Sequence, residues 1–314
     1  MPLNNETILI TGGAGFIGSN LADRLIQEGY KVIVIDNLST GKKENLNPKA
    51  KFYKADICSA EVSKIFGKEK PKIVFHLAAQ INVKKSMENP AEDARTNILG
   101  SVNVLENCRN FGVKKIIFTS TGGAIYGKAN IIPTSEKYPA FPLSPYGIAK
   151  LTTEKYLNYY YKIFDLPFIS LRLANVYGPR QNSKSEAGVV AIFCDKILSK
   201  EQPIIYGNGE QTRDFVYIKD VVKSAILATK IKKTGIFNIG TGEETNINTV
   251  FEIIKEKTKS ECKKTYSPLK KGETQRSCLD CSRAKKQLKW QPEYSLEKGL
   301  MLTIDWFKNN RKQS

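Results

Sequence analysis

Strand-like apolar runs alternate with helical segments through the first 175 residues of the 314-residue chain. The strand-like runs lie at 7–11, 31–35, 51–55, 72–77, 115–120 and 168–173, and the helical segments at 16–28, 59–68, 92–111 and 145–164. Strands that alternate with helices pair in parallel and carry helices on both faces of the sheet. We therefore expect an α/β fold with a Rossmann-type, doubly wound parallel sheet.

After about residue 175 the pattern becomes irregular, with turns at Gly178-Pro179 and Gly207-Asn208-Gly209. We expect residues 1–174 to form the first domain and 175–314 most of a smaller, mixed α/β domain. The chain is expected to return to the first domain at about 213–240. The sequence has no long linker, so the two domains should be fused with a cleft between them.

Histidine and cysteine content restricts the chemistry. His76 is the one histidine, so a His-rich metal site is excluded and a Ser-His-Asp or Cys-His hydrolase would depend on it. Six cysteines lie without framework spacing, and the one CxxC, Cys278 to Cys281, has no second pair to complete a zinc shell. The sequence shows neither an 18-residue apolar run nor a signal peptide. These features predict a cytoplasmic protein that binds no metal and no membrane.

A net charge of +18 raises the question of nucleic-acid binding. Nine of the 49 basic residues are Arg and the others are Lys, often in dispersed pairs such as Lys42-Lys43 and Lys114-Lys115. Nucleic-acid sites favour clustered Arg and aromatic stacking platforms. We therefore expect a solvated lysine-rich surface and no nucleic-acid partner, with a small share of the charge serving an anionic substrate.

A glycine-rich turn follows the first strand-like run, where Gly12, Gly15 and Gly18 form GxxGxxG before a helical segment. Glycines permit the tight turn, let backbone N–H groups approach a pyrophosphate and let the helix pack closely on the strand. Asp36 ends the second strand, 24 residues after Gly12. Its carboxylate can accept hydrogen bonds from an adenosine ribose and would repel a 2′-phosphate. The combination predicts NAD as the cofactor.

A Tyr-x-x-x-Lys pattern begins the segment 145–164, and its spacing places Tyr146 and Lys150 on one helix face. A free tyrosine has a pKa of about 10 and is a poor base at neutral pH, whereas a neighbouring lysine cation favours the phenolate. The preceding strand ends in the hydroxyls of residues 119–121. One of these hydroxyls can bind the same substrate oxygen as Tyr146, which is typical of a tyrosine base activated by lysine.

Further segments extend the pattern: TGGAGFIG at 11–18, DNLSTG at 36–41, HLAA at 76–79, TNILG at 96–100, LRLANVYGPR at 171–180 and QTRDFV at 211–216. With the glycine turn and the Tyr-x-x-x-Lys pattern, they make the chain similar to the extended short-chain dehydrogenase/reductases. Within these it most resembles the NAD-dependent UDP-glucose 4-epimerase family, nearly from end to end.

The resemblance implies an NAD site in the first domain. In it Asp56 and Ile57 would contact the adenine, and Thr96 would lie near the nicotinamide. The implied cofactor residues are Gly12, Gly15, Phe16, Ile17, Asp36, Asn37, Ser39, Thr40, Gly41, Asp56, Ile57, Leu77, Ala78, Ala79, Thr96, Tyr146 and Lys150. The family gives His76 no catalytic role, and we interpret it as a packing residue at a strand end.

The resemblance also implies the catalytic roles. Tyr146 would be the phenolate base, Lys150 would hold its charge and bind the cofactor ribose, and a Ser or Thr would steady the reacting oxygen. In the family that hydroxyl stands 25 residues before the Tyr, which selects Thr121. The following Gly122-Gly123 differs from the commoner serine-rich loop, so Ser120 stays as an alternative.

Substrate contacts are implied mainly for the second half of the chain. The implied residues are Ser86, Thr121, Tyr146, Asn175, Val189, Ile204, Tyr206, Arg213, Lys270, Glu273 and Arg276. Arg213 matches a diphosphate-binding Arg, with a surface ion pair to Asp214 as the alternative interpretation. Lys270 replaces the family's usual Arg, and Lys271 and Arg276 are candidates to compensate for that loss.

Differences between this sequence and those of related enzymes indicate which reaction to expect. Related 4,6-dehydratases have an acidic pair where this chain has Gly122-Gly123. Related decarboxylases place a Glu near that loop, where this chain has Gly, Ala and Ile at 123–125. Net reductases of the superfamily generally use NADPH, which Asp36 disfavours. We therefore expect 4-epimerisation of a UDP-hexose through a transient 4-keto sugar, with UDP-glucose and UDP-galactose as substrates and a role in galactose metabolism.

Substrate range and assembly follow from the same resemblance. The small Ser277 stands at the family's gate position, so UDP-GlcNAc and UDP-GalNAc are also expected as substrates. The alternatives are another nucleotide-sugar epimerase, such as a UDP-glucuronate 4-epimerase, and a non-catalytic NAD-binding regulatory protein. A homodimer through the helices 92–111 and 145–164 is expected from the family.

Overall fold

The computed structural model describes residues 6–184, 188–268 and 274–311, and contacts within these ranges divide the chain into two compact units. The first unit comprises the residues up to Ile125, Pro142–Arg172 and Val222–Phe237. The second comprises Tyr126–Phe141, Leu173–Val221 and the described residues from Asn238 onward. The sequence pattern placed the first boundary at 174 and did not single out the segment 126–141.

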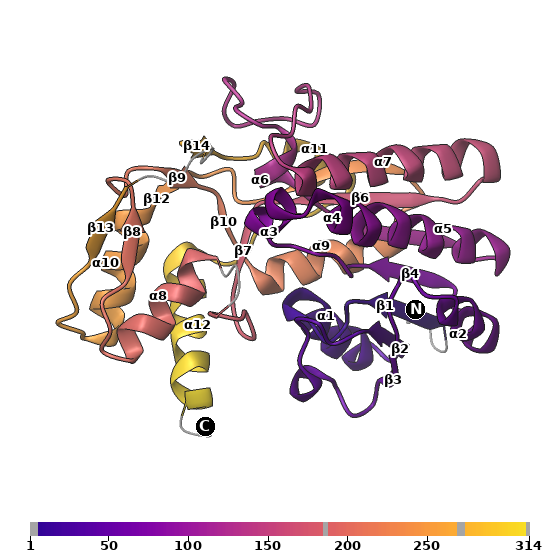
Figure 1. The fold of residues 1–314 in the computed structure, drawn as a ribbon, viewed down its shortest axis with the longest axis horizontal. Coiled ribbons are helices and arrows are strands. Elements are labelled where there is room, and N and C mark those ends of the chain that lie inside the picture. Colours follow the sequence, from indigo (N-terminus) through magenta and orange to yellow (C-terminus); the bar gives the residue numbers. More distant parts are fainter. Residues whose placement is uncertain (1–5, 185–187, 269–273, 312–314) are drawn as a thin grey trace. The chain divides into compact units, whose positions relative to one another are not determined.

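A seven-stranded parallel sheet, counted over the described residues, has the order β11-β6-β5-β4-β1-β2-β3 (Figure 1). Its strands are β1 (Thr7–Thr11), β2 (Lys31–Asp36), β3 (Lys51–Lys54), β4 (Ile73–His76), β5 (Lys115–Thr121), β6 (Phe168–Leu173) and β11 (Gly235–Ile239). The order reverses at β1, which pairs with β2 on one side and β4 on the other. Ligands of such sheets bind at the carboxyl ends of the strands beside this point. The predicted α/β fold class is confirmed.

Helices cover the sheet of the first unit. They are α1 (Phe16–Gln27), α2 (Glu61–Glu69), α3 (Val83–Glu88), α4 (Pro90–Ala94), α5 (Gly100–Asn110), α6 (Gly122–Ile125), α7 (Pro145–Phe164) and most of α9 (Ile218–Lys230), with a short 3-10 helix η1 (Lys43–Asn45). Ser144 starts α7 because its hydroxyl accepts the Gly147 N–H at 3.2 Å and Pro145 occupies the first turn. The predicted segment 92–111 is helical as far as Asn110, with the π-helix η2 (Arg95–Leu99) between α4 and α5.

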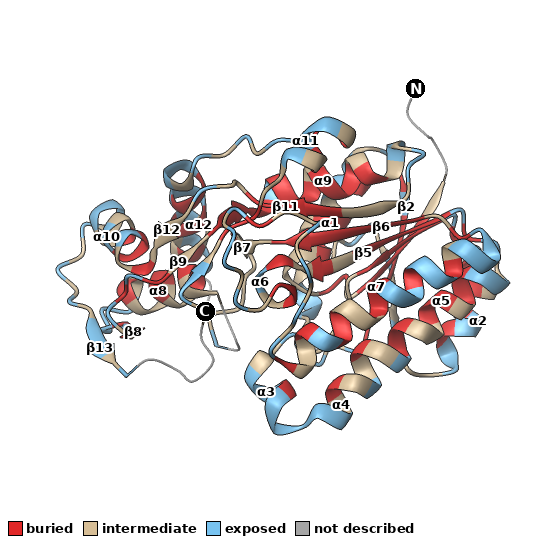
Figure 2. Cartoon of the chain, turned by 90° about the horizontal axis from the view of Figure 1, so that it is seen from above, coloured by how far each residue is buried: buried red, intermediate tan, exposed pale blue. Residues whose placement is uncertain are grey.

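The core of the first unit lies between the sheet and the helices α2, α5 and α7. Leu9, Val74 and Phe118 of the sheet pack there with Val104 of α5 and Leu157 of α7. The inner strands of the sheet and β6 are almost entirely buried, whereas the edge strand β3 is not, and α5 and α7 alternate buried and exposed residues (Figure 2). Each fully buried Leu, Val or Phe side chain stabilises the fold by roughly 1.5–3 kcal/mol. The polar residues discussed below are therefore held by a rigid apolar base.

Short strands and helices build the second unit. β7 (Asn175–Tyr177) pairs with β10 (Phe215–Tyr217), β8 (Ile204–Tyr206) with β13 (Thr265–Ser267), and β9 (Thr212–Arg213) lies between β12 (Thr245–Asn246) and β14 (Arg276–Ser277). The helices are α8 (Val189–Leu198), α10 (Ile247–Thr258), α11 (Ser282–Gln287) and α12 (Leu296–Arg311). This agrees with the expected mixed α/β composition.

Backbone pairing explains why the segment 126–141 belongs to the second unit. Thr134 donates its N–H to Cys278 at 2.9 Å and accepts the Asp280 N–H at 2.9 Å. The Asn238 side chain donates to the Thr134 carbonyl and accepts the Tyr126 hydroxyl, at 2.9 and 2.8 Å. These contacts join residues more than 100 positions apart in the sequence, so no local pattern announces them.

No helix in the part of the chain that the structure describes is both long and apolar enough to cross a bilayer. Over the same residues, no group of three or more His, Cys, Asp or Glu side chains is placed to hold a metal ion. Cys278 and Cys281 are free thiols, and burial raises the pKa of both above the ordinary value. Neither thiol therefore has the thiolate character that redox exchange requires.

Candidate cofactor and active site

The glycine-rich turn connects β1 to α1. Gly12 has a φ of +74°, and a Cβ there would lie 2.7 Å from the backbone nitrogen of Ala78. A Cβ on Gly18 would overlap the Gly12 carbonyl, so this glycine allows α1 to pack against the turn. Gly15 caps α1 without a side-chain hydrogen bond, which leaves the first N–H groups of the helix uncapped by side chains. Such a turn can bind a pyrophosphate.

Asp36 lies at the end of β2 and faces this turn. Its Oδ2 accepts the Ala14 N–H at 3.0 Å, and its Oδ1 accepts the Leu38 N–H at 2.8 Å. Burial raises the pKa of Asp36, and the two N–H groups act against that rise. A Cβ at Gly41 would lie 2.9 Å from both carboxylate oxygens. The carboxylate is thus fixed beside the turn with lone pairs left for the diol of a ribose, and these residues fit an adenosine dinucleotide.

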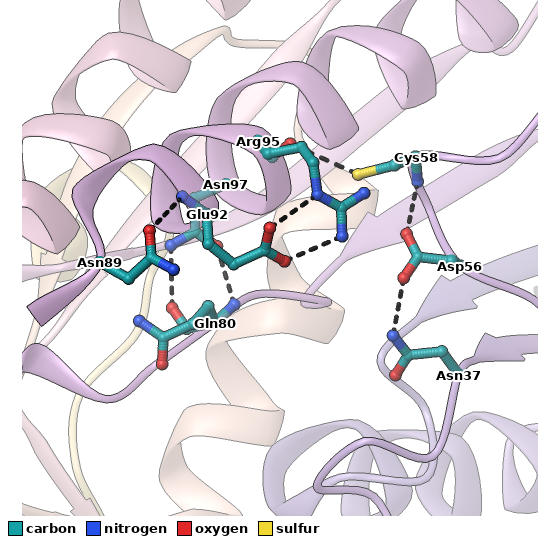
Figure 3. A network of polar contacts seen from close by, with 8 residues as sticks. All are labelled: Asn37, Asp56, Cys58, Gln80, Asn89, Glu92, Arg95 and Asn97. Atoms are coloured by element: carbon teal, nitrogen blue, oxygen red, sulfur yellow. Dashed lines mark hydrogen bonds and ion pairs between the residues drawn. The ribbon is translucent and has the colours of Figure 1, made fainter. Parts of the chain in front are cut away.

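A chain of polar contacts links the end of β2 to η2 (Figure 3). Asp56 accepts the Asn37 amide at 2.9 Å and the Cys58 N–H at 2.8 Å, and the Cys58 thiol donates to the Arg95 carbonyl at 3.4 Å. Burial opposes the ionisation of Asp56, but the Cys58 N–H and the Asn37 amide hold its pKa below the ordinary range. Arg95 forms a two-point ion pair with Glu92, at 2.9 Å for each contact. Asp56, Ile57 and Thr96 are therefore brought to one edge of the sheet.

His76 is fully buried at the end of β4, and both of its ring nitrogens contact hydroxyls. Ser101 donates to the Asn97 carbonyl at 2.6 Å, so its oxygen accepts from His76 Nε2 at 2.9 Å. Thr11 accepts the N–H groups of residues 77–78, so its hydroxyl donates to His76 Nδ1 at 2.7 Å. Burial lowers the pKa of His76 to about 3. His76 is therefore a neutral connector between β1 and α5, which agrees with its interpretation as a strand-end packing residue.

A buried amide network surrounds the π-helix η2. Asn97 accepts the Gln80 N–H at 2.8 Å and donates to the Gln80 carbonyl at 2.9 Å and to Asp93 Oδ1 at 2.9 Å. Its backbone carbonyl accepts hydrogen bonds from the hydroxyls of Ser101 and Thr153, at 2.6 and 3.1 Å. Sequence reasoning assigned no role to Asp93, Gln80 or Asn97. The available signal was the four-residue spacing of Asp93, Asn97 and Ser101, which places polar groups on one buried helix face.

The residues predicted to be catalytic lie in the first unit, on β5 and α7. Lys150 donates to the Thr119 carbonyl at 2.9 Å, and its Nζ lies 5.8 Å from the centre of the Tyr146 ring. Thr121 is partly exposed at the end of β5 and accepts the Ala124 N–H at 3.2 Å. Ser120 is buried, and no described residue hydrogen-bonds its hydroxyl. A lysine ammonium beside a partly exposed tyrosine can stabilise a phenolate.

Lys150 is 3% exposed, and its surroundings decide its charge. Burial lowers its pKa to about 8, and the carboxylates of Asp93 and Glu154 act against that fall. Its Nζ also lies 4.7 Å from the centre of the Phe118 ring. A buried lysine that titrates near neutral pH is a frequent mark of a functional site.

The predicted substrate residues fall in both units. Ser86 is fully buried in α3 and donates its hydroxyl to the Val83 carbonyl at 2.6 Å, so this hydrogen is not available to a sugar. In the second unit, Asn175 begins β7, Val189 begins α8, and Ile204 and Tyr206 are exposed on β8. Lys270 and Glu273, like Lys271, lie outside the described residues.

Two arginines of the second unit occupy neighbouring strands. Arg213 of β9 donates to the Thr212 carbonyl at 2.8 Å and pairs in register with Ser277 of β14. Asp214 is 1% exposed, and its carboxylate accepts backbone N–H groups of the second unit, so it is not a surface residue as the alternative interpretation of Arg213 required. Arg276 forms a two-point ion pair with Glu244, which offsets its charge. A guanidinium group is well suited to a diphosphate, and these two lie on adjacent paired strands.

Comparison with known proteins identifies the family to which the chain belongs. A family model described as GDP-mannose 4,6 dehydratase matches residues 9–303. A putative UDP-glucose 4-epimerase from Methanocaldococcus jannaschii is 46% identical over 97% of this chain and 99% of its own length.

Two solved structures are also similar. One is a UDP-glucose 4-epimerase from Thermotoga maritima with UDP-glucose, 50% identical with a TM-score of 0.96 over 97% of this chain and 99% of that one. The other is a UDP-glucose 4-epimerase from Thermus thermophilus in complex with NAD, 39% identical with a TM-score of 0.92 over 96% and 99%. The chain therefore belongs to the NAD-dependent epimerase/dehydratase family of the extended short-chain dehydrogenase/reductases.

Proposed function

We propose that the protein is an NAD-dependent 4-epimerase that interconverts UDP-glucose and UDP-galactose. The observation that carries the proposal is the buried Lys150 beside Tyr146, at the sheet edge that also holds the glycine turn and Asp36. The names of the similar proteins from M. jannaschii, T. maritima and T. thermophilus support it. Its place in galactose metabolism and in the cytoplasm stays a prediction.

In this proposal the chain's own residues move one proton and hold one charge. NAD would be held by the glycine turn and Asp36, and when bound it would supply reversible hydride transfer at C4 of the sugar. Tyr146, as phenolate, takes the proton of the sugar 4-hydroxyl and later gives it back, while Lys150 stabilises the phenolate. Thr121 donates a hydrogen bond to the reacting oxygen. We prefer Thr121 to Ser120 because it is partly exposed, whereas Ser120 is 4% exposed.

The residues after β5 limit the outcome to epimerisation. Gly122 and Gly123 begin α6 and carry no side chain that could protonate or deprotonate a 4-keto sugar. Elimination of water and loss of carbon dioxide both need such a group near the ring. Without it, the 4-keto sugar can only be reduced again, on either face. The diphosphate must stay bound while the sugar turns, and we assign that anchoring to Asn175 and Arg213, with Val189, Ile204 and Tyr206 at the uridine.

A substrate panel tests the proposal. Purified protein with UDP-glucose should give a mixture of UDP-glucose and UDP-galactose, the same mixture from either side, as measured by NMR of the anomeric protons. UDP-glucuronate tests the alternative epimerase. Turnover of UDP-glucuronate with none of UDP-glucose would replace the proposal by that alternative, and no turnover of any sugar nucleotide would favour the regulatory NAD-binding protein.

Substrate range gives a separate prediction. Ser277, partly buried on β14 opposite Arg213, is a small residue at the expected gate of the sugar pocket. We expect the protein to turn over UDP-GlcNAc as well as UDP-glucose, and Ser277→Tyr to lose UDP-GlcNAc turnover while keeping that of UDP-glucose. Steady-state kinetics on both sugars measure this. An equal loss of turnover with both sugars in Ser277→Tyr would contradict the assignment of Ser277 as the gate of the sugar pocket. Turnover of UDP-glucose alone by the unsubstituted protein would also contradict it.

We also propose that the protein is a homodimer through η2, α5 and α7. Ile148, Tyr156, Tyr159 and Ile163 are exposed on α7 at positions that share one helix face, and Leu99 of η2 is 62% exposed. A surface of this apolar character is typical of an interface between proteins. The double variant Tyr159→Glu, Ile163→Glu should therefore be a monomer by light scattering coupled to gel filtration. Lys64→Glu on the exposed face of α2 is the control, and a monomeric unsubstituted protein would contradict the proposal.

A further inference from the structure

A buried carboxylate that the proposed mechanism does not use lies next to the catalytic lysine. Asp93 of α4 is 1% exposed, and its Oδ1 accepts the side-chain amides of Gln80 and Asn97, at 2.8 and 2.9 Å. No described residue donates a hydrogen bond to the other oxygen, Oδ2, although this oxygen is buried. A buried carboxylate oxygen without a donor is costly, so a charge of the opposite sign is expected nearby.

Lys150 of α7 is that charge. The helices α4 and α7 pack against each other, and Thr153, three residues after Lys150, donates its hydroxyl to the Asn97 carbonyl at 3.1 Å. The electrostatic influence is mutual: Asp93 counteracts the fall that burial imposes on the pKa of Lys150, and Lys150 counteracts the rise that burial imposes on that of Asp93. The hydrogen bonds through Asn97 hold the two elements in register.

Glu154, the second acid near Lys150, is already paired. Arg172 donates to both of its oxygens, at 3.0 Å from Nε and 2.6 Å from Nη2, and Ser170 donates to Oε1 at 3.0 Å. A two-point pair of this kind is nearly neutral as a unit. The hydrogen-bond donors of Asp93, in contrast, are neutral amides. Asp93 is therefore the net negative charge that acts on Lys150.

We propose that Asp93 is a positioning residue that acts through Lys150: its carboxylate keeps Lys150 in the ammonium form, and Lys150 in turn keeps Tyr146 a phenolate. Asp93 stays ionised throughout and exchanges no proton with substrate. The inference rests on the proposed function, because it gives Lys150 the task of stabilising the base. The Gln80 and Asn97 amides orient the carboxylate for this task.

The groups around Lys150 come from several elements. They are Asp93 of α4, Tyr146 and the paired Glu154 of α7, the neutral His76 of β4, the Thr119 carbonyl and Phe118 ring of β5, and Arg172 of β6, which is bound to Glu154. Removing the charge of Asp93 leaves in place both the hydrogen bond from Lys150 to the Thr119 carbonyl and the ion pair of Glu154 with Arg172.

The variant Asp93→Asn keeps the shape and one acceptor oxygen and removes the charge. Lys150 should then lose its proton more readily, so the alkaline limb of the pH profile of kcat should move down by about one pH unit, since an opposite charge nearby shifts a pKa by roughly one to three units. Activity on the acidic side of the optimum should change little. Glu92→Gln, at the partly exposed neighbour on α4, removes the same charge and should leave the alkaline limb in place.

A second readout does not depend on the sugar. The pKa of Lys150, followed by NMR of a labelled lysine ε-carbon and assigned with Lys150→Met, should fall in Asp93→Asn. An unchanged lysine pKa, or a loss of activity equal at every pH, would overturn the inference. In the unsubstituted protein the labelled Asp93 carboxyl should be ionised at neutral pH, and a protonated Asp93 would overturn it even if Asp93→Asn does not fold. A shifted lysine in a protein that epimerises no sugar nucleotide would overturn the proposed function alone.

Discussion

Replacing Tyr146 by Phe should lower kcat by about a thousandfold, within the range of 10² to 10⁴ that general acid–base catalysis contributes. The substitution removes the one oxygen that can take the proton of the sugar 4-hydroxyl, while the ring stays in place near Lys150. NAD binding should change little, because the glycine turn and Asp36 hold the dinucleotide independently of that oxygen. Turnover of UDP-galactose and the content of bound NAD, measured on the same sample, check both halves of the prediction.

Tyr161→Phe is the matched control for that variant, since it removes one hydroxyl from the same helix, on a ring that packs against the core. It should keep both turnover and bound NAD. Full activity in Tyr146→Phe would show that another group is the base, and the proposed mechanism would be wrong. Loss of NAD together with activity would instead assign Tyr146 a cofactor-binding task.

The second large effect is expected for Gly12→Ala. A non-glycine residue at the left-handed φ of +74° costs roughly 1–2 kcal/mol, and the new Cβ would lie 2.7 Å from the Ala78 nitrogen. That nitrogen is itself fixed, because it donates to the Thr11 hydroxyl at 3.2 Å. The turn must therefore shift away from the geometry that a pyrophosphate needs, and NAD affinity should fall by about tenfold to a hundredfold, at 1.4 kcal/mol for each factor of ten.

Gly112→Ala separates the effect of the left-handed φ from the effect of the close contact with the Ala78 nitrogen. Gly112 also has a left-handed φ, of +66°, but a Cβ there meets no atom within 4 Å. This control should lose roughly 1–2 kcal/mol of stability from the backbone alone and keep its NAD affinity, as measured by thermal unfolding and by titration calorimetry. Equal NAD affinities in the two variants would contradict the role that we give to the turn.

The fold of the first unit could be predicted because its pattern is local. Each strand of the sheet from β1 to β6 is an apolar run bounded by polar or small residues, and α7 begins at the Ser144-Pro145 signal as expected. The π-helix η2 could not be predicted, because the hydroxyls that donate to its Asn97 carbonyl come from outside it, and one of them, on Thr153, lies 56 residues away. The attachment of the segment 126–141 to the second unit depends on similarly distant contacts.

The residues of the candidate site also fall into two groups, those that a local sequence pattern predicts and those that depend on tertiary packing. Tyr146, Lys150, Gly12 and Asp36 belong to motifs with fixed spacing, so the sequence alone suggested them. The partnership of Asp93 with Lys150 has no spacing rule, since it arises from the packing of α4 on α7 and becomes visible only with burial and hydrogen bonds. Sequence suggests which residues can react, whereas their protonation states follow from tertiary contacts.

The most direct test of the proposed epimerisation follows the hydrogen on C4 of the sugar. UDP-glucose carrying deuterium at C4 should be converted to UDP-galactose that keeps the deuterium at C4, in ordinary water, as measured by NMR and mass spectrometry. Retention is expected because, in the proposed mechanism, the C4 hydrogen moves as hydride and does not exchange with water, while Tyr146 exchanges only the hydroxyl proton. Formation of UDP-galactose in which solvent hydrogen has replaced the deuterium would contradict the account.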